Sequence, residues 1–125
     1  LLSPKSNLMI TIYHNPRCRK SREGLALLEA SKLPFEIRDY LNNPPEIAEL
    51  KSLTEKLQIE PMGLIRQNEA IWKEKFKNKK LTDAQIFQGI KDFPILLERP
   101  VVVSENQAVI GRPPENILKF LKPGI

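Results

Sequence analysis

Residues 9–41 follow a strand–helix–strand pattern that restricts the chain to folds with a parallel pair of strands. Residues 9–13 (MITIY) are β-branched and aromatic, and residues 14–16 (HNP) end this run with a turn. Leu25 and Leu28 give the next segment a helical apolar stripe up to about residue 31, and residues 34–41 alternate as a second strand. Strands joined through a helix in this way run parallel, which predicts a βαβ unit in an α/β fold.

Three helical patterns fill the middle of the chain, after the second strand. We expect the first helix to begin at Pro44 with Asn43 as its N-cap. Short helices between residues 61 and 80 follow, and then a helix whose capping box spans residues 82–85. These patterns predict a helical insertion between the second strand and the third.

The C-terminal part of the chain predicts a hairpin and a closing helix. Residues 101–103 (VVV) are the strongest strand pattern in the sequence, and residues 108–111 return as their antiparallel partner. In the closing helix we expect Ile117, Leu118 and Leu121 to face inward. The whole order predicts a thioredoxin-like fold, with a four-stranded mixed sheet and a helical insertion between strands 2 and 3.

Length and composition fit one globular domain. The 125 residues are 41% hydrophobic and 28% charged, with no apolar run near the roughly 18 residues of a membrane span. Residues 1–8 lack the pattern of a secretory signal, and the first strand opens only at Met9. We therefore expect residues 1–8 to be a flexible N-terminal extension and residues 9–125 to form a single domain. The one cysteine allows no internal disulfide and fits a cytoplasmic setting. We also expect a monomer that does not associate with membranes.

The net charge of +5 raises the question of nucleic-acid binding. Much of this charge comes from a cluster of lysines in the middle of the chain: Lys73, Lys75, Lys77, Lys79 and Lys80. A cluster of this kind is typical of a solvated helix face and the loop after it. We therefore expect no nucleic-acid partner.

Cys18 is the only cysteine, and it lies just beyond the first strand at the start of the first helix. The unpaired backbone N–H groups and the positive dipole end of a helix favour a thiolate over a thiol. Further positive charge comes from Arg17, Arg19, Lys20 and Arg22. A lone cysteine is more often a small buried side chain, but the basic flanks favour a reactive nucleophile here.

Five motifs follow one another along the chain: residues 10–18 (ITIYHNPRC), 40–45 (YLNNPP), 64–66 (LIR), 94–103 (PILLERPVVV) and 112–113 (RP). With these motifs the chain resembles the glutaredoxin-coupled arsenate reductases, the ArsC family, whose fold is shared by the stress regulator Spx. The resemblance runs from residue 9 to about residue 121.

The resemblance implies roles for five residues. Cys18 is the nucleophile, His14 helps to keep it ionised, and the oxyanion is held by Arg66, Arg99 and Arg112. Arginine stays charged and donates paired hydrogen bonds, so three guanidinium groups at a helix N-terminus make a site for a tetrahedral oxyanion. The plainer alternatives are a His14 that only caps backbone groups and surface positions for Arg66 and Arg112.

Two residues support the implied site. Pro100 takes the place of the cis proline that precedes the third strand in this fold, the alternative being an ordinary trans proline at a strand start. Ser21 either donates a hydrogen bond to the thiolate or satisfies local backbone groups. We expect no metal in the site.

The activity implied by the resemblance is reduction of arsenate to arsenite, with glutathione as co-substrate, glutaredoxin as partner and no tightly bound cofactor. The single cysteine agrees with this activity, because the other thiols then come from outside the chain. The alternatives are a glutathione-dependent thiol–disulfide reductase and an Spx-like regulator that binds RNA polymerase. The regulator is the weaker alternative, because Ser21 stands where many Spx proteins carry the second cysteine of a C-x-x-C motif.

Overall fold

The structure is a computed structural model, and it describes residues 9–121. Within this range the chain forms two compact units, one of residues 9–39 and 99–121 and one of residues 40–98. The expected flexible extension at residues 1–8 lies outside the described residues. A single domain over residues 9–125 stays a prediction.

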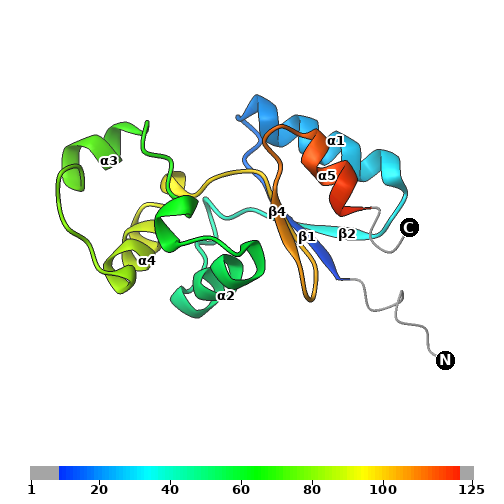
Figure 1. The fold of residues 1–125 in the computed structure, drawn as a ribbon. Coiled ribbons are helices and arrows are strands. Elements are labelled where there is room, and N and C mark those ends of the chain that lie inside the picture. Colours follow the sequence, from blue (N-terminus) through cyan, green and yellow to red (C-terminus); the bar gives the residue numbers. More distant parts are fainter. Residues whose placement is uncertain (1–8, 122–125) are drawn as a thin grey trace. The chain divides into compact units, whose positions relative to one another are not determined.

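The first unit is built on a four-stranded mixed sheet (Figure 1). Its strands, in the order β2-β1-β3-β4, are β1 (Ile10–Tyr13), β2 (Phe35–Arg38), β3 (Val101–Val103) and β4 (Ala108–Ile110). β1 is parallel to β2 and antiparallel to β3, and β3 is antiparallel to β4. The predicted α/β, thioredoxin-like architecture is confirmed, with the helical insertion between β2 and β3.

Two helices, α1 (Arg19–Ser31) and α5 (Glu115–Phe120), lie side by side against one face of this sheet (Figure 1). Alternate residues of a strand face the same side of the sheet, so Ile10 and Ile12 of β1 both face the helices. The buried residues that share this core are Ile10, Ile12, Leu28, Val102 and Ile117. Because α5 contributes to this core, it holds the chain that follows β4 against the sheet.

One prediction for α5 was wrong. Ile117 is fully buried, but Leu118 is 39% exposed. Residues three and four apart share a helix face, whereas the next residue lies about 100° further round. Phe120 and Leu121 therefore pack against the core with Ile117, and Leu118 faces outward.

The second unit is helical. It contains α2 (Ile47–Leu57), α3 (Ala70–Lys75) and α4 (Asp83–Asp92), with 3₁₀ turns η2 (Pro61–Leu64) and η3 (Pro94–Leu96). The predicted capping box of α4 is confirmed: the Thr82 hydroxyl accepts from the N–H of Gln85 at 3.1 Å, and the Gln85 side chain accepts from the N–H of Thr82 at 2.8 Å. Such a reciprocal pair satisfies two of the N–H groups that a helix start leaves open.

The predicted start of α2 was wrong. The N-cap is Glu46, which forms a capping box with Glu49, and Asn43 lies three residues before it. A residue that precedes a proline is disfavoured in helical geometry, and Pro45 imposes this on Pro44. The helix therefore begins only after both prolines.

An antiparallel bridge between Ile65 and Leu97 ties the η2 segment to the η3 segment. The N–H of Arg66 donates to the carbonyl of Leu96 at 2.8 Å, and the N–H of Glu98 donates to that of Leu64 at 2.7 Å. These bonds bring Arg66 and Glu98 next to each other inside the second unit.

The surface of the second unit carries the lysine cluster. All five lysines are exposed, as the sequence predicted: Lys73, Lys75, Lys77, Lys79 and Lys80. That no nucleic acid binds there stays a prediction. Within residues 9–121, none of the helices is both long enough and apolar enough to span a membrane.

Candidate active site

The loop between β1 and α1 is closed by hydrogen bonds of its own residues. The N–H of Cys18 donates to the carbonyl of Asn15 at 3.0 Å, and the N–H of Arg17 donates to Asn15 Oδ1 at 2.9 Å. The guanidinium of Arg22 donates to the carbonyl of Pro16 at 2.9 Å. These contacts fix Cys18 at the end of the loop, where α1 begins.

Cys18 is the N-cap residue of α1, with extended φ and ψ angles of −96° and 122°. Partial burial, the largest single influence, raises the pKa of its thiol. The backbone N–H groups of Ser21 and Lys20 and the guanidinium of Arg99 together lower the pKa by more than burial raises it. The net result is a thiol pKa below its ordinary value, which increases the fraction of nucleophilic thiolate at neutral pH.

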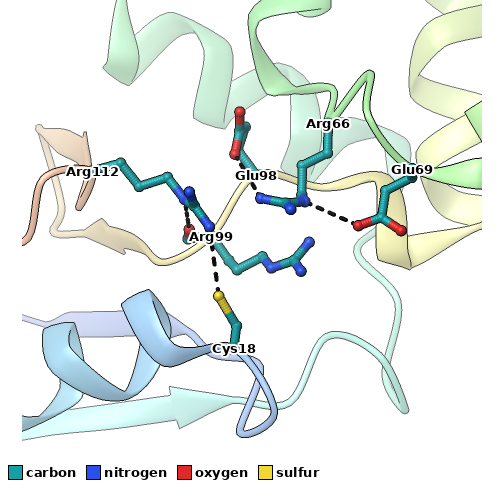
Figure 2. Close-up of polar contacts among 6 residues, drawn as sticks. All are labelled: Cys18, Arg66, Glu69, Glu98, Arg99 and Arg112. Carbon is teal, nitrogen blue, oxygen red and sulfur yellow. Dashed lines mark hydrogen bonds and ion pairs between the residues drawn. The ribbon is translucent and has the colours of Figure 1, made fainter.

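Two arginines of the first unit gather at this thiol (Figure 2). Arg112 Nη2 lies 3.6 Å from Cys18 Sγ, and its Nε donates to the backbone carbonyl of Arg99 at 2.8 Å. Arg99 is itself only 7% exposed. The sequence prediction that Cys18, Arg99 and Arg112 meet is therefore supported by geometry, and their grouping can bind a tetrahedral oxyanion.

Pro100 directly follows Arg99, and the peptide bond between the two residues is cis, as predicted. The Pro100 carbonyl accepts from the N–H of Gly111 at 2.8 Å. A Cβ placed on Gly24 would lie 2.9 Å from Pro100 Cγ, and one placed on Gly111 would lie 3.0 Å from it. Any side chain at position 24 or 111 would therefore crowd the Pro100 ring, and glycine at both positions leaves room for it. A second cis bond, between Arg112 and Pro113, has no counterpart in the sequence predictions.

His14 and Ser21 contact each other. His14 Nδ1 and Ser21 Oγ are 2.7 Å apart, and the same oxygen accepts from the N–H of Asn15 at 2.9 Å. Burial lowers the pKa of His14, a hydrogen bond with Ser21 raises it, and the charge of Arg22 lowers it, with a net decrease. The neutral form of His14 is therefore favoured more than in a free imidazole. The effect of His14 on the ionisation of Cys18 stays a prediction. The Ser21 hydroxyl contacts His14 and the N–H of Asn15, both in the loop.

Arg66 belongs to the second unit, where two carboxylates hold it (Figure 2). Its Nε donates to Glu69 Oε2 at 3.1 Å, and its Nη1 lies 3.6 Å from Glu98 Oε1. Glu69 is three residues from Arg66, a spacing that predicts a contact. Glu98 is far away in sequence and carried no such signal. The predicted role of Arg66 in oxyanion binding stays a prediction.

The basic residues directly after Cys18 are paired with a carboxylate. Arg19 Nε and Lys20 Nζ lie 3.3 Å and 3.8 Å from the carboxylate of Glu23, and the Arg19 side chain is 83% exposed. Exposed ion pairs one helical turn apart contribute little to the stability of the helix or of the fold. The positive charge that the sequence places beside the thiol is therefore partly cancelled in the structure.

The site is formed from cysteine, arginine, histidine and serine side chains. Among residues 9–121, no three His, Cys, Asp or Glu side chains gather closely enough to hold a metal ion. The chemistry supported by the described residues is thiolate attack on an anion held by guanidinium groups.

Several known proteins are similar to this chain over most of its length. A protein named arsenate reductase from Neisseria meningitidis serogroup A is 42% identical over 110 residues, covering 86% of this chain and 94% of that protein. A protein of the same name from Haemophilus influenzae is 39% identical over 116 residues, covering 91% and 100%. The solved structure of an arsenate reductase from Vibrio cholerae matches with a TM-score of 0.85 at 40% identity, covering 90% of this chain and 97% of that one.

The family assignment follows from the extent of these matches. The sequence model of the ArsC family matches residues 13–120, which include the cysteine loop, both cis prolines and all three candidate arginines. The chain belongs to the ArsC family.

Proposed function

We propose that this protein reduces arsenate to arsenite through Cys18, with glutathione and glutaredoxin as external thiols. The observation that carries the proposal is a thiol of lowered pKa whose Sγ lies 3.6 Å from the guanidinium of Arg112, with Arg99 beside it. The names of the similar proteins from Neisseria meningitidis and Haemophilus influenzae support arsenate as the substrate.

The first step is attack of the Cys18 thiolate on arsenic(V). A sulfur–arsenic bond forms, an arsenic–oxygen bond breaks, and the leaving oxygen takes up protons from the oxyanion and from solvent and departs as water. Arg99 and Arg112 offset the negative charge of the oxyanion and hold it at the thiolate. We also assign Arg66 to this anion, as the resemblance implies.

The second step uses glutathione as the reductant. Its thiolate attacks the sulfur of Cys18, a disulfide bond forms, and the electron pair of the sulfur–arsenic bond stays on arsenic. Arsenic thereby changes from the +5 to the +3 state and leaves as arsenite. Two thiols have become one disulfide, which supplies the two electrons.

The third step restores Cys18. A glutaredoxin thiolate attacks the glutathione sulfur of the mixed disulfide and releases the Cys18 thiolate. An external partner is needed because the 125-residue sequence contains no second cysteine. A monomer in a glutathione-rich cytoplasm fits this cycle, since cytoplasmic thiols are kept reduced.

The test is arsenate-dependent oxidation of NADPH in the presence of glutathione, glutathione reductase and glutaredoxin. We expect turnover that requires every component and is abolished by Cys18→Ser and strongly reduced by Arg99→Ala. Arg19→Ala is the matched control, because its guanidinium is exposed and paired with Glu23. Its activity should remain close to that of the unaltered protein.

The same assay separates the proposal from the alternative thiol–disulfide reductase. For this comparison glutaredoxin is left out and the rate without the protein is subtracted, because glutaredoxin itself reduces glutathione mixed disulfides. Replacing arsenate with a mixed disulfide of glutathione and a small thiol should then give slow turnover or none. Turnover with that disulfide and none with arsenate would reject the proposal and favour the alternative.

A further inference from the structure

The position of Arg112 depends on more than its own side chain. Its Nε is anchored on the carbonyl of Arg99, and this leaves Nη2 at the Cys18 sulfur. The guanidinium keeps this geometry only if the backbone that carries it is also fixed, because a shift of that backbone moves the whole side chain. The backbone contacts of residues 110–112 therefore bear on the site.

Asn116, in the first turn of α5, holds this backbone. Its Nδ2 donates to the carbonyl of Ile110 and to the carbonyl of Arg112, each at 3.3 Å. Both partners are acceptors, so the amide nitrogen and not the amide oxygen must face them. The single NH₂ group therefore donates its two hydrogens to the two carbonyls that flank Gly111.

The same segment has a second anchor. The N–H of Gly111 donates to the carbonyl of Pro100, the residue directly before β3, at 2.8 Å. Residues 110–112 are thus held both by Pro100, through Gly111, and by α5, through Asn116. The side-chain requirements are narrow, since Asp lacks the donors, Ser has only one, and Gln is longer by one methylene group.

We propose that Asn116 is a positioning residue, which acts through the backbone of Arg112 to place the guanidinium at Cys18 and at any oxyanion bound there. It has no contact with the reacting atoms of its own. For the thiol the inference stands on the geometry of the first unit, and for the oxyanion it rests on the proposed function.

The experiment measures two properties of Cys18 in Asn116→Ala. The first is the pH profile of its alkylation by iodoacetamide, whose midpoint should move to higher pH because the guanidinium is no longer held at the sulfur. The second is the arsenate concentration that half-protects Cys18, which should rise about 2- to 10-fold for the loss of one anchoring contact. Asn106→Ala is the matched control, because Asn106 lies exposed in the turn between β3 and β4. It should change neither property.

A second comparison separates positioning from a general loss of structure. In an Arg112→Ala background, adding Asn116→Ala should shift the alkylation midpoint no further, because the residue through which Asn116 acts is gone. Asn116→Ser keeps one donor and should give an intermediate shift in the otherwise unaltered protein, at temperatures well below its unfolding transition.

The proposal and the proposed function fail in different ways. Equal midpoint shifts from Asn116→Ala with and without Arg112, or no shift in either Asn116 variant, would overturn the positioning role. Failure of arsenate to protect Cys18 in the unaltered protein would count against arsenate reduction, and the alkylation profiles would still decide the role of Asn116.

Discussion

Gly24 is the position where the smallest added group should disturb both the fold and the site. It lies in the middle of α1, and a Cβ there would be 2.8 Å from Ile117 Cδ1 and 2.9 Å from Pro100 Cγ. Real Cβ contacts are not this short, so something must move. The Ile117 methyl group can rotate away, but the Pro100 ring is closed and its carbonyl is bonded to Gly111. We therefore expect Gly24→Ala to destabilise the protein.

The magnitude follows from two opposing effects. Overpacking a buried site costs about 1–3 kcal/mol of unfolding free energy. Replacing glycine by alanine inside a helix returns about 1 kcal/mol. Because both contacts are below 3.0 Å, we expect an overpacking cost in the upper part of this range, about 2–3 kcal/mol, and therefore a net loss for Gly24→Ala of about 1–2 kcal/mol. With an unfolding entropy of about 2.1 cal/mol/K per residue, a chain of 125 residues loses about 4 °C of Tm per kcal/mol, so the Tm should fall by about 4–8 °C.

The assay is thermal unfolding followed by circular dichroism, with Gly89→Ala as the matched control. Gly89 is also helical, in α4, but its nearest obstacle is the Phe76 ring at 3.3 Å. The helix gain should then roughly cancel the strain, and the Tm should stay within about 2 °C. Adding Ile117→Val, which removes Cδ1, should cost less in the Gly24→Ala background than alone. A Tm of Gly24→Ala equal to or above that of the unaltered protein would refute the steric reasoning.

Three other predictions concern charges and caps. Arg99→Ala should move the midpoint of Cys18 alkylation to higher pH, because the guanidinium lowers the pKa of the thiol; an unchanged profile would leave the helix N–H groups as the dominant cause. The native pKa of His14 lies below its ordinary value of 6.5, so the unfolded state takes up this proton first. The contribution of His14 to the unfolding free energy should therefore be constant above about pH 6.5 and decrease as the pH drops through the native pKa, and urea titrations of His14→Gln should lack this decrease. Thr82→Ala removes the cap of α4 and should cost about 1 kcal/mol, or about 4 °C in Tm; no change would show that solvent satisfies the Gln85 N–H equally well.

Local patterns predicted those parts of the fold that depend on near neighbours in sequence. The capping box at Thr82 and Gln85 lies within one turn, and the α1 start at Cys18 follows directly from a strand and a turn. The errors came where several local preferences compete or where a contact is distant. Asn43 is a good cap, but the double proline after it moves the helix start to Glu46.

The candidate site was predictable to the extent that residue types reveal chemistry. Cys18, Arg99 and Arg112 follow from motifs and meet in the first unit. Asn116 and Glu98 could not be found in this way, because their partners are a pair of backbone carbonyls and an arginine 32 residues earlier. The Glu98 contact joins segments far apart in the chain. The partners of Asn116 are only four and six residues away, but they are backbone carbonyls, which every residue type has, so the sequence gives no sign of the contact.

The electrostatics of Cys18 illustrate why the flanking residues were a poor guide to the actual cause. Arg19 and Lys20 are nearest in sequence, but their charges face solvent and share the carboxylate of Glu23. Salt and water screen such exposed charges over roughly 10 Å or less. The groups that lower the thiol pKa are the N–H dipoles of α1 and the buried guanidinium of Arg99, and the guanidinium in contact with the sulfur comes from 94 residues away. Because burial weakens screening, the buried guanidinium of Arg99 outweighs several exposed basic side chains. Thiolate formation is thus coupled to the packing that fixes Arg99 and Arg112, and residues 19 and 20 are left free to differ without loss of the nucleophile.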